Sequence, residues 1–266
     1  MIKVIAAGTS FTFGSGLHFY ERFKNNKELS FLNLEPIEYE HNVKNSYSSL
    51  LAKKFDGEST IVGTSGYYNS FLDSISEIKK LLETNSNVKI VLFQLINPER
   101  DFFIYNDVIY YLDITNYNSF IESKNKLIST LDDSIDKIDF VEKLDKDIEL
   151  YTYNQPQWRI NHTEYFINIL NELNEYLLKR GIILQILSYY NSYDSSLLKF
   201  PKNSFVIIHH NGIRYSNIFN FVENTKLRIR DDIKITDDDH PNFEAHRIVM
   251  ESVYQNILKH PLYSTI

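Results

Sequence analysis

The sequence predicts an α/β fold, a three-layer α/β/α sandwich built on a doubly wound parallel sheet of about five strands. Two observations lead to this prediction. Apolar runs of strand length, such as Ile2 to Ala7 and Val88 to Leu95, show almost no polar alternation, which is typical of strands buried on both faces of a parallel sheet. Amphipathic helical segments follow these runs in alternation, and no internal repeat interrupts the order.

The composition limits the domain count and the class of partner. A chain of 266 residues is long enough for one large domain, and no linker divides it, so we expect a single domain over residues 1–266. The net charge of -7 gives no basic surface for nucleic acid, and no apolar run reaches the length of a membrane span. The chain has no cysteine, which excludes disulfides, thiolate metal sites and cysteine nucleophiles.

These limits favour a small-molecule or glycan partner. The first residues do not resemble a signal peptide, because the apolar run is too short and its removal would take away the predicted first strand. We therefore expect a cytoplasmic protein, with association to a virion as the alternative. The composition does not indicate an oligomeric state.

The first strand ends in a serine flanked by glycines. Glycine is scarce, with 8 in the chain, so its clustering within residues 8–16 and 63–66 marks two turns that need special backbone geometry. Parallel sheets hold their sites beyond the carboxyl ends of the strands. Ser10 is expected to open the next helix there, with its hydroxyl exposed and its amide unpaired. The alternative is that Ser10 only caps that helix.

The other elements follow from apolar spacing and from the residues that end helices. Helices are predicted where apolar residues recur every three or four positions, and Gly57 and Gly181 stand where helices usually end. The alternation indicates a flavodoxin-like sheet order, with an insertion or lid around residues 101–158. In chain order we expect a short helix near Tyr20 to Asn25, a helix from Ser46 to Phe55, a strand from Ser59 to Val62, a helix from Phe71 to Leu82, the strand Val88 to Leu95, a hairpin or lid from Phe102 to Asn118, helices from Phe120 to Leu150, a helix that follows Trp158, strands from Ile182 to Leu187 and from Phe205 to Ile208, and a last helix through Ile248 to Ile257.

A histidine with a nearby carboxylate precedes the last helix. Asp237 stands three residues before His240, and Pro241 follows. A carboxylate at this spacing can accept the Nδ1 proton of His240 while Nε2 points toward a nucleophile. Pro241 fits the first turn of the next helix, where no amide donor is needed. The alternative is an acidic helix start, in which the aspartates complement the helix dipole.

Together these blocks resemble the SGNH, or GDSL, hydrolase family in order and spacing over nearly the whole chain. Residues 8–16 are similar to the family's Gly-Asp-Ser block, with Thr9 in place of the aspartate. Residues 63–66, Gly-Thr-Ser-Gly, are similar to the second block, and residues 237–242 match the last. The third block departs from the family's Gly-x-Asn-Asp, because residues 94–98 read Gln-Leu-Ile-Asn-Pro.

The resemblance implies a serine esterase that needs no cofactor and no metal. Ser10 would attack an ester carbonyl, His240 would take the Ser10 proton, and Asp237 would hold the imidazole tautomer. Water would then release the acyl group. The oxyanion would be bound by the amides of Ser10 and Gly66 and by the side chain of Asn97, with Asn69 as the alternative to Asn97.

The substrate and two other function classes stay open. Aromatic residues from Phe102 to Tyr111, with Trp158, favour an O-acetyl or short-acyl ester on carbohydrate, because flat apolar faces suit sugar rings. Lipid esters, thioesters and acyl transfer to another acceptor use the same residues. A non-catalytic SGNH-like binding or virion-associated module would explain the altered third block. A nucleotide-binding protein is a third possibility, but this sequence has neither the P-loop lysine nor the Gly-x-Gly-x-x-Gly spacing that such proteins use.

Other side chains could carry chemistry. Ser65 lies in Gly-x-Ser-Gly and not in the Gly-x-Ser-x-Gly of a nucleophile elbow, so it ranks below Ser10. His246 and His240 stand six residues apart, which on a helix is a rotation of about 240° and disfavours a shared metal. Structural or surface roles are expected for His209, His210 and Arg100, which could otherwise line the cleft or meet an anionic group.

Overall fold

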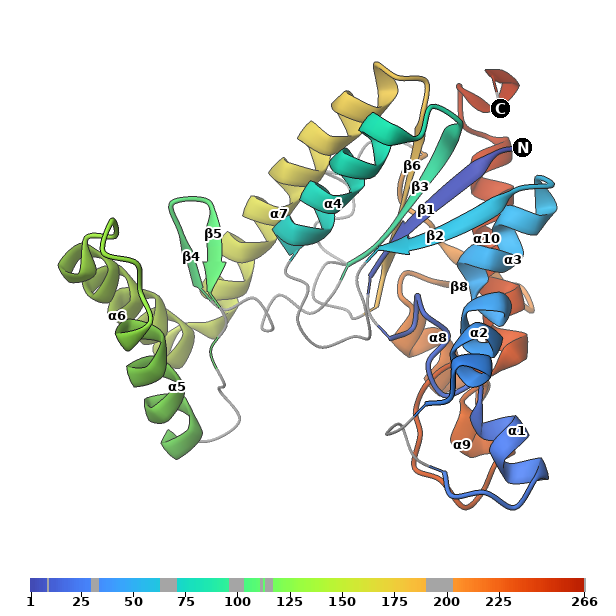
Figure 1. Cartoon of the computed structure of the whole chain (residues 1–266), viewed down its shortest axis with the longest axis horizontal. Coiled ribbons are helices and arrows are strands. Elements are labelled where there is room, and N and C mark those ends of the chain that lie inside the picture. The colour runs from blue at the N-terminus through green and yellow to red at the C-terminus, as the bar shows by residue number, and fades with distance from the viewer. Residues whose placement is uncertain are drawn as a thin grey trace.

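Four parallel strands form the central sheet, in the order β2-β1-β3-β6 (Figure 1). The computed structural model describes residues 1–8, 10–29, 34–62, 71–95, 103–110, 112, 117–189 and 203–265. The strand order reverses between β1 and β3, and such a switch point is where doubly wound sheets bind ligands, beyond the carboxyl ends of the strands. The sheet strands are β1 (Lys3–Ala7), β2 (Glu58–Val62), β3 (Val88–Leu95) and β6 (Ile183–Ser188).

Helices cover both faces of this sheet, which confirms the predicted α/β/α sandwich (Figure 1). Along β1, Val4 and Ala6 pack in the layer of α3, α8 and α10, and Ile5 and Ala7 pack in the layer of α4 and α7. This alternation is the two-residue period of a strand, and both layers are apolar because both faces are covered. The helices of the two layers are α3 (Tyr47–Lys54), α8 (Ile218–Thr225) and α10 (Phe243–Leu258) on one face, and α4 (Phe71–Thr84) and α7 (Gln155–Leu178) on the other.

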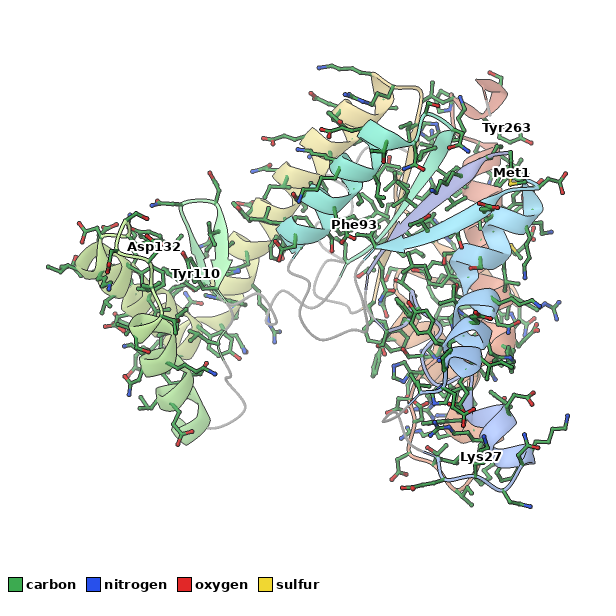
Figure 2. All side chains as sticks on the ribbon, viewed as in Figure 1. Met1, Lys27, Phe93, Tyr110, Asp132 and Tyr263 are labelled. Carbon is green, nitrogen blue, oxygen red and sulfur yellow. The ribbon has the colours of Figure 1, made fainter. Side chains whose placement is uncertain are left out.

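Side chains fill the space between the sheet and its helices (Figure 2). Phe93, labelled near the end of β3, packs against Phe71 at the start of α4, with ring centroids 5.2 Å apart. The described residues contain no helix that combines the length and apolar character needed to cross a membrane. The remaining elements are α1 (Phe19–Lys24), α2 (Pro36–Asn45), α5 (Tyr117–Ser129), α6 (Lys137–Tyr153), α9 (Ile229–Asp232), β4 (Phe103–Tyr105), β5 (Val108–Tyr110), β7 (Ile208–His210), β8 (Ile213–Tyr215) and a 3-10 turn at Tyr263–Thr265.

The segment from Phe103 to Trp158 builds a hydrophobic cluster of its own, away from the sheet (Figure 1, green). The hairpin of β4 and β5 packs on α6, where the ring of Phe140 meets Phe103 and Tyr105 edge to face. Helix α7 is shared, because its first turns carry Trp158 into this cluster and its later turns pack on the sheet. The hairpin prediction is confirmed, and the action of this insertion as a lid stays a prediction.

Four local predictions need correction. Ser10 does not open a helix, because turns occupy the chain up to α1 at Phe19. The predicted fifth strand is only a single parallel bridge, from Ile186 to Phe205, since residues 208–210 pair in a separate hairpin. Trp158 lies inside α7 and does not precede it, because Asn154 caps the helix. Pro241 stands before α10, whose cap is Asn242, and pairs with Arg228.

Candidate active site

A glycine-dependent turn presents Ser10 just after β1. A Cβ on Gly8 would lie 2.7 Å from the Gln94 Cβ, so only glycine fits there. Gly14 and Gly16 have φ of 70° and 88°, the left-handed region that L side chains rarely adopt, and these two residues prevent a helix from forming. The Ser10 carbonyl accepts from the Ser15 amide at 2.9 Å. Within the described residues, Ser10 Oγ and its amide have no hydrogen-bond partner, so both remain available to a ligand.

Three consecutive aspartates precede His240, and each meets a different environment. His240 Nδ1 donates to Asp238 Oδ1 at 2.5 Å, and the His240 amide donates to the same oxygen at 3.0 Å. Asp238 is buried. Asp239 pairs with Arg230 at 2.9 Å. Asp237 is exposed.

The predicted carboxylate partner of His240 was therefore wrong, since Asp238 and not Asp237 holds the imidazole. The backbone explains the difference. Asp238 and His240 use their carbonyls to accept from Arg230 and Ile229 at 2.9 and 2.8 Å, as in a short antiparallel pairing. In an extended chain, side chains two positions apart share a side, whereas Asp237 points away.

The turn after β1 contacts this carboxylate–imidazole pair directly, although the two segments lie near opposite ends of the chain. The Phe11 ring stacks on the His240 ring, with centroids 4.7 Å apart, and on its other side stacks on Tyr189 at 3.9 Å. Tyr189 follows β6, and its amide donates to Leu95 at the end of β3. Gly16 lies against Asp238 Oδ2, a buried oxygen without a hydrogen-bond partner in the described residues.

Ser10 and His240 thus lie beyond the same edge of the sheet, at the switch point. No hydrogen bond joins Ser10 Oγ to His240 in the described part of the chain. Catalytic hydrogen bonds of this kind often form only when substrate is bound. The arrangement pairs the imidazole with a buried carboxylate and places the turn that carries Ser10 against that imidazole through Phe11.

The residues expected to complete an oxyanion site lie outside the described residues. These are Gly66, Asn69 and Asn97, and two other candidates, Ser65 and Arg100, lie there as well. The segments that carry them follow β2 and β3, which flank β1 in the sheet. Their roles therefore stay predictions.

Three other histidines lie outside the pair that His240 forms with Asp238. His209 is exposed, and His210 is half-buried with its ring edge against Phe221. His246 is buried on α10, where its Nδ1 accepts from the Tyr47 amide at 3.2 Å. The described residues contain no group of three or more side chains suited to hold a metal ion.

His246 should make the folded protein sensitive to acid. Burial, with a smaller effect of the nearby His240, lowers the pKa of His246 to about 3, whereas an exposed histidine titrates near 6.5. Between these two pH values the unfolded chain binds more protons than the folded chain, so the free energy of unfolding falls as the pH falls. The slope contributed by one such group is at most about 1.4 kcal/mol per pH unit.

We therefore expect His246→Asn, which keeps an acceptor for the Tyr47 amide, to flatten the acid dependence of stability. Urea unfolding at pH 6.5 and pH 5 should show that the wild type loses about 1.6 kcal/mol more than this variant over the interval. His209→Asn, at an exposed position, is the matched control and should behave as the wild type. Equal losses in the wild type and in His246→Asn would contradict the assignment.

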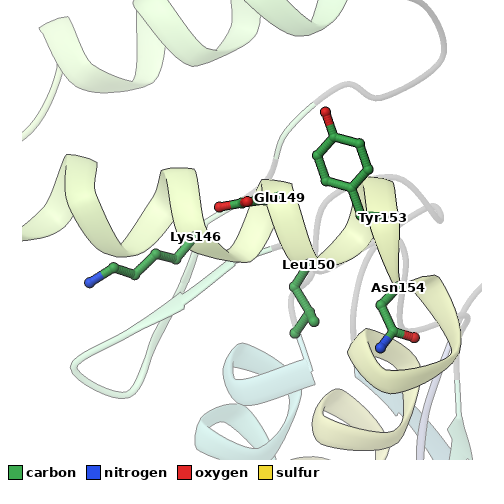
Figure 3. Close-up of a pocket in the computed structure, with 5 residues that line it drawn as sticks. All are labelled: Lys146, Glu149, Leu150, Tyr153 and Asn154. Atoms are coloured by element: carbon green, nitrogen blue, oxygen red, sulfur yellow. The ribbon is translucent and has the colours of Figure 1, made fainter.

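Two surface hollows lie elsewhere and show no convergent chemistry. The one in Figure 3 is lined by Lys146, Glu149, Leu150, Tyr153 and Asn154, and the Tyr153 side chain points opposite to Leu150 and Asn154. The other lies at α1 and α2, where Arg22 forms two 2.8 Å bonds with Glu38 and holds the pKa of that carboxyl at about 2. Within this hollow Arg22 is paired with Glu38, and Lys27 with Glu35.

Comparison with protein-family models gives no match, and comparison with curated proteins gives none either. Function therefore has to be inferred from the residues and their geometry. Sequence reasoning missed Asp238 in the candidate site, and the two-residue alternation of an extended segment before α10 was the signal that could have found it. It also missed the stacking of Phe11 on His240, for which the sequence carries no signal.

Proposed function

We propose that the chain is a serine hydrolase of SGNH type that cleaves an ester through an acyl-enzyme. Ser10 is the nucleophile, His240 the general base and Asp238 the carboxylate that orients the imidazole. One observation carries the proposal. The residue next to Ser10 stacks on His240, whose Nδ1 is bound to a buried aspartate.

The hydrogen bond from Nδ1 to Asp238 fixes the tautomer of His240. With the Nδ1 proton donated to the carboxylate, Nε2 carries a lone pair that can accept the Ser10 proton. As Oγ attacks the ester carbonyl, Nε2 takes that proton and then gives it to the departing alcohol. Water attacks the acyl-enzyme in the same way, and the negative charge of Asp238 stabilises the imidazolium in both steps.

The unpaired amide of Ser10 supplies one donor to the oxyanion. The family resemblance adds the amide of Gly66 and the side chain of Asn97, or of Asn69 in its place. The loss of one such donor typically costs about 10²–10³-fold in kcat, so the altered third block bears on rate more than on reaction type.

The proposal specifies the hydrolysis of an ester and does not specify the alcohol part of that ester. Three of the aromatic residues that favoured a carbohydrate are packed in a core, since Trp158 is 0% exposed and Phe103 and Tyr105 are buried. Buried rings offer no face to a sugar. Activated short-chain esters are therefore the appropriate first substrates.

A non-catalytic binding module is the second candidate, favoured by the altered third block, in which residues 94–98 read Gln-Leu-Ile-Asn-Pro. The two candidates differ in covalent chemistry at Ser10. An esterase should react there with a fluorophosphonate probe, and a binding module should not.

The test combines p-nitrophenyl acetate turnover with fluorophosphonate labelling, followed by peptide mapping. We expect the wild type and Ser15→Ala, a matched serine in the same turn, to turn over the ester and to be labelled at Ser10. Ser10→Ala should do neither. Equal turnover in the wild type and Ser10→Ala would refute the nucleophile, and an unlabelled, inactive wild type would favour the binding module.

A further inference from the structure

A buried cluster of polar side chains connects the Ser10 turn with β3 and α3. Thr12 Oγ1 donates to Gln94 Oε1 at 2.5 Å and lies 2.9 Å from the Tyr47 hydroxyl, which is 3.3 Å from the same Gln94 oxygen. All three side chains are at most 1% exposed. Water therefore cannot replace a hydrogen bond lost within the cluster, and each unsatisfied group there is costly.

The number of hydroxyl protons determines the direction of the hydrogen bonds in this cluster. Two hydroxyl protons, of Thr12 and Tyr47, serve three contacts, so only two of them can be hydrogen bonds at one time. The two shorter distances give a chain in which Tyr47 donates to Thr12 and Thr12 donates to Gln94. Burial raises the pKa of the Tyr47 phenol, which keeps it protonated and able to donate. Thr12 is the central member, because it both accepts and donates.

The chain continues to the helix that follows His240. The Tyr47 amide donates to His246 Nδ1 at 3.2 Å, and the two rings stack with centroids 6.0 Å apart. His246 lies in the first turns of α10, beside α3 (Figure 1). The same cluster packs against Gly8 at the start of the turn, since Thr12 and Gln94 occupy the space that a Cβ on Gly8 would need.

We infer that Thr12 is a positioning residue. Through its hydrogen bonds with Tyr47 and Gln94, it holds the turn that carries Ser10 in a fixed place relative to the general base His240. This inference rests on the proposed function. A hydroxyl two residues from the nucleophile fixes the turn to β3, and Tyr47 fixes it to α10. Loss of the Thr12 hydroxyl should shift Ser10 relative to His240 without touching the substrate, and a misplacement of about 1 Å can cost about 10²-fold in rate.

The test uses Thr12→Val, which keeps the shape and removes the hydroxyl, and Thr12→Ser, which keeps the hydroxyl. We expect Thr12→Val to lower kcat for p-nitrophenyl acetate by about 10–100-fold with KM within about twofold. The fluorophosphonate labelling rate at Ser10 should fall in parallel. Thr12→Ser should recover kcat to within about threefold of the wild type. Thr163→Val, at another buried threonine on α7, is the control and should leave kcat unchanged.

Tyr47→Phe provides a second variant that does not depend on the folding of Thr12→Val. It removes the phenol donor and should also lower kcat with KM preserved, and the two changes combined should cost less than the product of their separate effects. Turnover that needs Ser10 but is unchanged in Thr12→Val and Tyr47→Phe would overturn the positioning role alone. Turnover that persists in Ser10→Ala would overturn the proposed function and the positioning role with it.

Discussion

Asp238→Asn should lower kcat for an ester by about 10⁴-fold, whereas the same change at the adjacent position, Asp237→Asn, should leave kcat within about twofold of the wild type. Asp238 is buried and accepts from both the Nδ1 and the amide of His240, while Asp237 is exposed. An asparagine amide can present a donor to Nδ1, which places the ring proton on Nε2 and removes the base. It also removes the charge that stabilises the imidazolium.

Steady-state turnover of p-nitrophenyl acetate by the two variants measures this difference. The pair is matched, because each change replaces one carboxylate by an isosteric amide in the same segment. A large loss in Asp237→Asn with full activity in Asp238→Asn would show that the family spacing, and not the observed hydrogen bond, identifies the carboxylate. Similar losses in both variants would contradict the assignment of this role to Asp238 alone.

Gly16→Ala should produce the largest loss of stability among these predictions, about 3 kcal/mol in the free energy of unfolding. A Cβ at this position would lie 2.5 Å from Ile229 Cδ1 and closer still to Asp238 Oδ2. The φ of 88° adds a conformational cost of about 1–2 kcal/mol for any L side chain. Because Asp238 would be displaced, labelling of Ser10 should slow in the folded protein.

Gly181→Ala separates the two causes. Gly181 also has a positive φ, of 67°, but a Cβ there would meet nothing within 4 Å. Urea unfolding should show a loss of about 1 kcal/mol for Gly181→Ala, the conformational part alone. If both variants lost the same free energy of unfolding, the close contact between Gly16 and Asp238 would contribute nothing to stability.

Much of the fold could be predicted because its signals are local. The apolar run of β3 and the spacing in α4 depend only on neighbours in sequence, and both elements were located to within a few residues. Helix α2 was missed although Pro36 stands at its first position, a usual place for proline in a helix. Its cap is Glu35, and it is held by Glu38 through the buried ion pair with Arg22 of α1.

The candidate site was only partly predictable. Ser10 and His240 were identified from motifs at the two ends of the chain, and the structure places both segments in contact through Phe11. The resemblance to the SGNH family itself stays a prediction. Trp158 was taken to favour a carbohydrate substrate because a sequence shows an aromatic residue without showing whether its ring is exposed, and this ring is buried.

By itself, the sequence determined the layers of the fold and the presence of a glycine-dependent turn after the first strand, since hydrophobic period and glycine placement act over a few residues. Only the tertiary structure decided which aspartate holds His240 and that Thr12 connects the turn to Tyr47 and Gln94. Those pairings depend on the direction in which each side chain leaves its backbone and on partners distant in sequence. A linear pattern specifies neither of these.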